Sequence, residues 1–166
     1  MAEATTALGR EASRQLGEYW RKIASCVALL SEDEVWWRAN PACNSVGNLL
    51  LHLTGNLSQW LLAGLGGASY ERHRAAEFAA DRSRRRDDLL AGLGEVVERA
   101  QGVAERTAAA DLVRRLTIQG MERDGFGVIF HAVEHMGYHT GQIVHITKEL
   151  AAGRAEIDFY PHLKGR

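Results

Sequence analysis

Apolar residues recur at steps of three and four along four long segments of the chain, which is the spacing of amphipathic helices. The pattern predicts helices over residues 7–30, 45–65, 83–106 and 125–152. Asn44 or Ser45 is a suitable N-cap for the second helix, Asp124 for the fourth, and Gly153 is a stop signal. No repeat or low-complexity segment interrupts the pattern. We therefore expect an all-α fold, a four-helix bundle formed by a single domain over residues 1–166.

The connectors carry weaker signals. Residues 31–44 combine an acidic cluster, two tryptophans and a proline, which indicates a loop with one short helical turn. Trp36 and Trp37 are expected to cover the core rather than to bind a ligand. The triplet at residues 116–118 has β-like composition, and we expect it to pack across one end of the bundle.

The second predicted helix is apolar or small on nearly every side except along one stripe. The stripe consists of Ser45, Asn48, His52, Asn56 and Gln59, at helical spacing. Either this stripe is the solvated face of the helix, or it lines a polar groove inside the bundle. The helix alone does not decide between these interpretations.

The fourth predicted helix carries His131, His135 and His139, spaced four residues apart in an apolar segment. Residues four apart lie about 40° apart around a helix, so the imidazoles form one stripe. By angle, His139 and His135 point most nearly into the bundle and His131 lies nearer the rim. Gln142 lies between His135 and His131 by angle, where it can hydrogen-bond a ligand histidine or a water.

Two neighbouring imidazoles on an apolar face need partners, and a divalent metal ion satisfies both. His52 is the candidate third ligand, because it is the only other histidine within a strongly apolar helical run. Three imidazoles would leave coordination positions open, as in catalytic sites. The alternative is that the histidines satisfy one another and water in a polar core. Three imidazoles accept zinc, nickel, iron or cobalt, so spacing does not identify the metal.

The composition of the chain argues against two classes of binding partner, nucleic acid and membranes. The formal net charge of -1 gives no electrostatic reason to expect nucleic acid or an anionic membrane surface. No apolar run approaches the length of a spanning helix, so no membrane association is expected. Cys26 and Cys43 show no CxxC spacing, which favours a reducing, cytoplasmic location.

The run NSVGNLLLHLTGNLSQW and the later run HMGYHTGQIVHITK resemble the DinB-like (YfiT-like) superfamily of proposed metalloenzymes, in particular its uncharacterised domain-of-unknown-function branch. The Glu77-Phe78 segment and TIQG at 117–120 also resemble that family. The resemblance implies a four-helix bundle holding a divalent metal, most often zinc or nickel, with His52, His135 and His139 as ligands. His131 falls outside the motif and is expected to be a neighbour of the site.

Members of that family with known activities include thiol-dependent S-transferases and isomerases that use mycothiol, bacillithiol or glutathione, while many others have no established reaction. The resemblance therefore implies a thiol-dependent activity as one expectation for this chain. Our first hypothesis is a metal-dependent enzyme that activates a low-molecular-weight thiol, or water, for reaction with a small-molecule substrate. The alternative is a non-catalytic metal-binding or stress-response module built as a dimeric scaffold. On angular grounds, the candidates for supporting the ligands or contacting substrate are His131, Gln142, Tyr138, Asn48 and Asn56.

A second apolar sector of the fourth helix, which includes Phe126, Phe130, Gly137 and Gly141, needs a further neighbour. Its two glycines would permit a close helix approach. That neighbour lies either within the monomer or across a homodimer, and we expect a homodimer.

Overall fold

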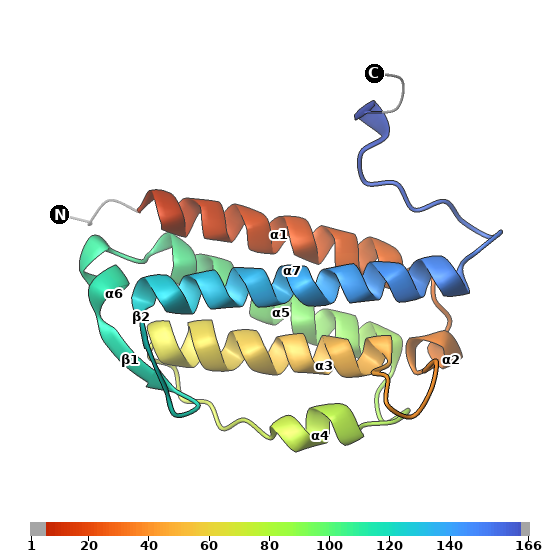
Figure 1. The fold of residues 1–166 in the computed structure, drawn as a ribbon, viewed down its shortest axis with the longest axis horizontal. Coiled ribbons are helices and arrows are strands. Elements are labelled where there is room, and N and C mark those ends of the chain that lie inside the picture. The colour runs from red at the N-terminus through yellow and green to blue at the C-terminus, as the bar shows by residue number, and fades with distance from the viewer. Residues whose placement is uncertain (1–5, 164–166) are drawn as a thin grey trace.

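Four long helices lie side by side in the computed structural model, which describes residues 6–163 (Figure 1). They are α1 (Ala7–Val27), α3 (Val46–Leu57) with its π-helical continuation η1 (Ser58–Leu65), α5 (Arg86–Glu105) and α7 (Gly125–Leu150). Helix α1 packs against α5 and α7, and α3 packs against α5 and α7. The predicted all-α four-helix bundle is confirmed. No helix among the described residues combines the length and apolarity needed to cross a membrane.

Short elements connect the bundle helices. They are α2 (Glu32–Val35), α4 (Arg74–Ala79), α6 (Ala109–Val113), the hairpin strands β1 (Arg115–Ile118) and β2 (Met121–Asp124), and the 3₁₀ turn η2 (Pro161–Leu163). Ile118 pairs with Met121, so Gln119 and Gly120 alone form the hairpin loop, and both have positive φ, as a type I′ turn requires. The β-like triplet therefore lies in strand β1, and Ile118 is buried against Gly64 of η1.

The helix ends lie within three residues of the sequence prediction, and one helix changes its type along its length. The predicted helix over 45–65 keeps its extent, but its last eight residues are π-helical. The N–H of Gly66 donates to the carbonyl of Leu61 at 2.8 Å, a five-residue step. Apolar spacing over so short a segment does not distinguish this hydrogen-bond pattern from the α-helical one, and π segments occur frequently at functional sites.

The polar stripe of α3 lies inside the bundle. Ser45 and Asn48 are fully buried, and His52 and Asn56 are 4% and 3% exposed. Of the two interpretations left open by the sequence, the internal one is correct, because neighbouring elements cover the stripe. A buried polar stripe requires hydrogen-bond partners from those elements.

Of the two tryptophans expected to cover the core, only one does so. Trp36 is buried and its indole N–H donates to the carbonyl of Arg84 at 3.2 Å. The prediction is wrong for Trp37, which is 42% exposed. The α2 turn directs successive side chains to different sides, and only one of them faces the bundle.

The second apolar sector of α7 is divided between two environments. At Gly137 the helix approaches α1 so closely that an added Cβ would lie 2.9 Å from the hydroxyl of Tyr19. Phe126 and Phe130 instead are 50% and 61% exposed and stack on each other with ring centroids 6.3 Å apart. Part of the sector therefore packs against α1 within the chain, and an aromatic pair remains exposed on the surface.

Asn48 joins the start of α3 to the far end of α4. Its side-chain oxygen accepts from the backbone N–H of Ser45 at 3.1 Å, which closes the capping box of α3. Its amide nitrogen donates to the carbonyls of Glu77 and Ala80 at 3.0 and 2.8 Å. One buried amide therefore fixes α4, and with it Glu77, against α3.

Replacing Asn48 by alanine is expected to lower the free energy of unfolding by about 3 kcal/mol, because several buried backbone groups lose their partner. Urea denaturation followed by circular dichroism measures this loss. Asn40→Ala is the control: Asn40 is exposed, and its replacement should change stability by less than about 0.5 kcal/mol. Equal losses in both variants would contradict the role assigned to Asn48.

Candidate metal centre

Three imidazoles from two helices meet at the centre of the bundle. His52 of α3 and His135 and His139 of α7 each offer a nitrogen, and these nitrogens all lie within 4.8 Å of one another. His52 and His139 are 4% and 7% exposed, and His135 is half-buried. The packing of α3 beside α7 thus brings together residues that lie 83 positions apart in the sequence.

The separation of the nitrogens fits a shared divalent ion. Nε2 of His52 lies 2.9 Å from Nε2 of His135. Because metal–nitrogen bonds are about 2.0–2.1 Å long, two imidazole nitrogens on one ion lie roughly 3 Å apart. Two acceptor lone pairs at 2.9 Å would repel each other unless a proton or a cation lies between them. The donor set therefore fits a metal ion, and a side-chain adjustment of about 1–2 Å brings in the third nitrogen.

Glu77 of α4 orients His52. Nδ1 of His52 donates to Oε2 of Glu77 at 2.9 Å, and Arg72 donates to both oxygens of the same carboxylate at 2.7 and 2.9 Å. A proton held at Nδ1 leaves the lone pair of Nε2 directed at the centre, as in carboxylate–histidine–metal arrangements. Burial by itself would raise the pKa of Glu77, but the hydrogen bonds from Arg72 and His52 outweigh it and lower this pKa. The carboxylate is therefore ionised at neutral pH.

The backbone of α3 has space for this carboxylate only because residue 55 is glycine. A Cβ at Gly55 would overlap Oε1 of Glu77. Arg72 also donates to the side-chain oxygen of Gln59 at 3.1 Å, and Gln119 at the tip of the β-hairpin donates to that same oxygen. The supporting network therefore joins α3, η1, α4 and the hairpin.

Gln142 orients His139, as Glu77 orients His52. Nδ1 of His139 donates to Oε1 of Gln142 at 2.6 Å, which leaves Nε2 of His139 as the ligand nitrogen. Tyr138 is 61% exposed, and its ring centroid lies 5.0 Å from that of His139. The structure thus brings Gln142 and Tyr138 to the centre, with Gln142 bonded to a ligand and Tyr138 at its edge.

His131 lies beside the three histidines without joining them. Its ring packs against Trp60 in a tilted arrangement, with ring centroids 4.0 Å apart, and stacks on His135 at 5.2 Å. Asn56 donates to its Nε2 at 3.3 Å. Asn56 therefore contacts a neighbour of the centre. Asn48, the remaining sequence candidate, bonds backbone groups of α4 and reaches no imidazole by a hydrogen bond in the described part of the chain.

Sequence reasoning did not single out Arg72 or Glu77. Both lie in residues 66–82, a polar segment of the sequence without clear periodicity. The one available signal was the resemblance of the Glu77-Phe78 segment to the DinB-like family. Phe78 lies over the site, with its ring centroid 4.7 Å from that of His52.

His131, His135 and His139 are neutral at physiological pH. Burial, together with the neighbouring His139, His52, His131 and Arg72, lowers the pKa of His135 to about 3. Burial also lowers the pKa of His139 and of His131. Neutral imidazole is the form that binds a metal ion, so protons do not compete for these nitrogens near pH 7.

Residues 4–157 match the family described as "Protein of unknown function (DUF1572)". The chain belongs to this family. No curated protein matches it. Among solved structures, a DinB-like protein from Bacillus subtilis is 16% identical with a TM-score of 0.68, and the match covers 90% of this chain and 97% of that one.

Two further structures are similar to this DUF1572 member. A DinB-like protein from Bacillus cereus is 12% identical with a TM-score of 0.65, covering 84% of this chain and 91% of the other. A conserved protein from Enterococcus faecalis is 15% identical with a TM-score of 0.71, covering 82% and 93%. These likenesses show the fold, and with the family match they support an uncharacterised branch of the DinB-like superfamily, as the sequence resemblance predicted.

Acid should destabilise the metal-free protein through its histidines. Between pH 6.5 and about 3 the unfolded chain takes up a proton at residue 135 that the folded chain excludes, so stability falls as the pH falls through this range. Melting temperatures of EDTA-treated protein at pH 7.5, 6.5 and 5.5 should decrease in that order. His135→Asn should make the decrease shallower, and identical slopes would contradict this account.

Glu77→Gln should weaken metal binding about 10- to 100-fold, because the amide accepts more weakly from Nδ1 of His52. Competition titration with a chromophoric zinc chelator measures the dissociation constant. Glu71→Gln is the matched control, since Glu71 lies in the same segment with its side chain 87% exposed. Unchanged affinity in Glu77→Gln would mean that the carboxylate does not support the ligand.

Proposed function

We propose that this protein is a metal-dependent enzyme in which His52, His135 and His139 hold one divalent ion at a site open to substrate. The observation that carries the proposal is the convergence of nitrogens from three imidazoles, two of which have their second nitrogen hydrogen-bonded away from the centre. Among the described residues, no further histidine, cysteine, aspartate or glutamate joins this group. Three protein ligands are typical of catalytic sites, and four of closed structural ones.

Bound at this site, the ion would supply Lewis-acid activation, lowering the pKa of a coordinated thiol or water. Zinc or nickel suits three imidazoles, and iron or cobalt is also accepted. Glu77 and Gln142 orient the ligands, and Arg72 keeps the Glu77 carboxylate charged and in place. Neither Cys43 nor the buried Cys26 belongs to the histidine group, so the nucleophile comes from outside the chain. The DinB-like resemblance supports a low-molecular-weight thiol in this role, with water as the variant.

The alternative function, a non-catalytic metal-binding or stress-response scaffold, is supported by a different observation. The exposed Phe126–Phe130 pair on α7 is suited to an association surface, such as the homodimer expected from the sequence. The homodimer and the cytoplasmic location stay predictions. A scaffold requires no exchangeable position on the metal, whereas an enzyme does.

Elemental analysis of protein purified without a histidine tag tests the site. We expect about one equivalent of metal per chain, and its loss in His135→Ala and His52→Ala. His131→Ala and His145→Ala are the matched controls, because they remove histidines of the same helix that lie outside the group and should retain the metal. Absence of metal from the wild type, or equal loss in all four variants, would remove the basis of the proposal.

The open position is tested on cobalt-loaded protein. Adding 2-mercaptoethanol should produce a thiolate-to-cobalt absorption band and change the visible cobalt spectrum, because thiolate occupies a free position. A spectrum insensitive to thiol and to other small ligands would favour the scaffold.

A further inference from the structure

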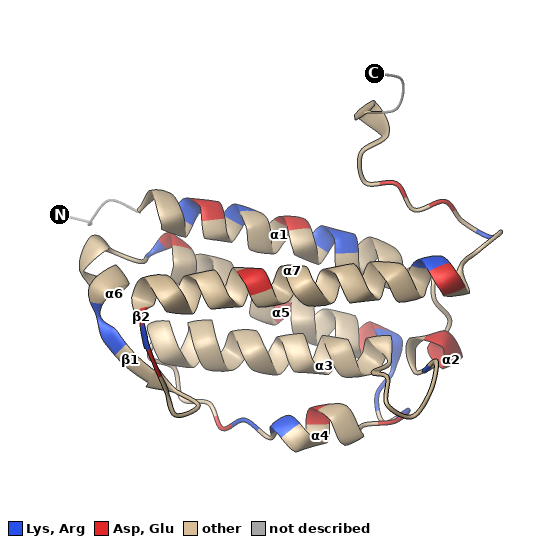
Figure 2. Cartoon of the chain, in the orientation of Figure 1, with Lys and Arg blue, Asp and Glu red and all other residues tan. Residues whose placement is uncertain are grey.

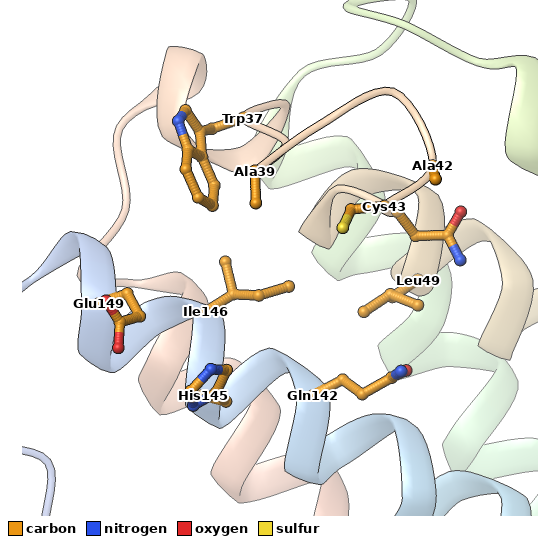
Figure 3. Close-up of a pocket in the computed structure, with 10 residues that line it drawn as sticks. Trp37, Ala39, Ala42, Cys43, Leu49, Gln142, His145, Ile146 and Glu149 are labelled. Carbon is orange, nitrogen blue, oxygen red and sulfur yellow. The ribbon is translucent and has the colours of Figure 1, made fainter.

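A pocket of about 550 Å³ opens between the connector after α2 and the C-terminal half of α7 (Figure 3). Its volume lies within the range of small-molecule sites, about 300–1,000 Å³. The lining residues that matter for the argument are Trp37, Cys43, Leu49, Gln142, Ile146 and Glu149.

Gln142 links the pocket to the candidate metal centre. This side chain lines the pocket and accepts the hydrogen bond from Nδ1 of His139. Along α7, residues 139, 142 and 146 follow one another at steps of three and four, so they share one face. On α3, Leu49 precedes His52 by three residues and lies on the same face. The pocket therefore begins about one helical turn from the ligand histidines.

The walls of the pocket are largely apolar, and the indole of Trp37 forms a flat part of them. Trp37 is 42% exposed and extends over the cavity, opposite the side chains of Ile146 and Leu49 (Figure 3). An indole face beside aliphatic side chains offers a surface on which a planar ring can stack and be removed from water. This accounts for a tryptophan that does not cover the core.

Charge restricts what the pocket accepts. Glu149 is the only acidic or basic residue among its lining residues, apart from the imidazole of His145. No lysine or arginine lines the cavity within the described part of the chain. A carboxylate or phosphate group bound there would lose its hydration without gaining a cationic partner, which is unfavourable.

We propose that this pocket holds the substrate of the histidine centre, and that the substrate is an uncharged or cationic planar aromatic compound stacked on Trp37. Its reactive end points toward Gln142 and His139. This inference rests on the proposed function and adds the chemical class of the substrate.

The probe pair N-phenyl-1-naphthylamine and its 8-sulfonate tests the pocket, because the two share their rings and differ by one anionic group. Fluorescence titration of metal-free protein should show saturable binding of one neutral probe per chain, and binding of the sulfonate at least tenfold weaker. Trp37→Ala and Ile146→Trp, which remove a wall and fill the cavity, should each weaken binding of the neutral probe at least tenfold.

Phe130→Ser is the control, since it removes an exposed aromatic residue of α7 outside the pocket and should leave probe affinity unchanged. Circular dichroism melting checks that each variant is folded, and the two pocket variants lie on different elements. The proposal is overturned if both pocket variants bind the neutral probe as the wild type does, if Phe130→Ser abolishes binding, or if the sulfonate binds equally well.

Cobalt-loaded protein tests the link between the pocket and the centre. The neutral probe should shift the visible cobalt spectrum of the wild type and leave that of Ile146→Trp unchanged. Probe binding without any spectral shift overturns the assignment of the pocket to the metal. Failure of cobalt to bind overturns the proposed function itself. The titration of metal-free protein distinguishes that result from a failure of the pocket to bind the neutral probe.

Discussion

The buried ion pair of Glu77 with Arg72 is the interaction on which the candidate centre depends. A carboxylate removed from water is costly unless its oxygens are paired, and here two arginine donors and the Nδ1–H of His52 satisfy them. The same hydrogen bonds fix the tautomer of His52 and so decide which nitrogen faces α7. The pair also determines where α4 lies, because Glu77 reaches His52 only across the bare backbone at Gly55.

A second constraint is the desolvation of the imidazoles. Keeping several neutral histidines together in the bundle core forfeits their hydration, which lowers the pKa of His135, His139 and His131. An ion bound between α3 and α7 would recover that free energy and join the two helices directly. With such an ion bound, metal binding and the stability of the bundle would be coupled.

The parts of this architecture that depend on local periodicity could be predicted from the sequence. The helices and the inward direction of His135 and His139 follow from apolar spacing. His52 could be chosen as the third candidate ligand because it lies in an apolar helical run. The position of Glu77 could not be predicted in this way, because α4 is held by side-chain contacts from Asn48 to distant backbone carbonyls. Trp37 was misassigned for a similar reason: composition indicates a tryptophan's preference for burial but not the direction of its side chain.

How a substrate would reach the centre depends on the side chains around the three histidines and on the charged residues of the bundle helices (Figure 2). The ring of Phe78 covers His52 from α4, and the packed rings of Trp60 and His131 occupy the side toward η1. Charged side chains of α7 are concentrated near its C-terminal end, apart from a single glutamate near its middle. Gln142 lies between His139 and the apolar pocket beside the connector after α2. In the proposed arrangement, a ligand entering there would meet the apolar cavity first and the histidines afterwards, so the shape and charge of the cavity would select the substrate.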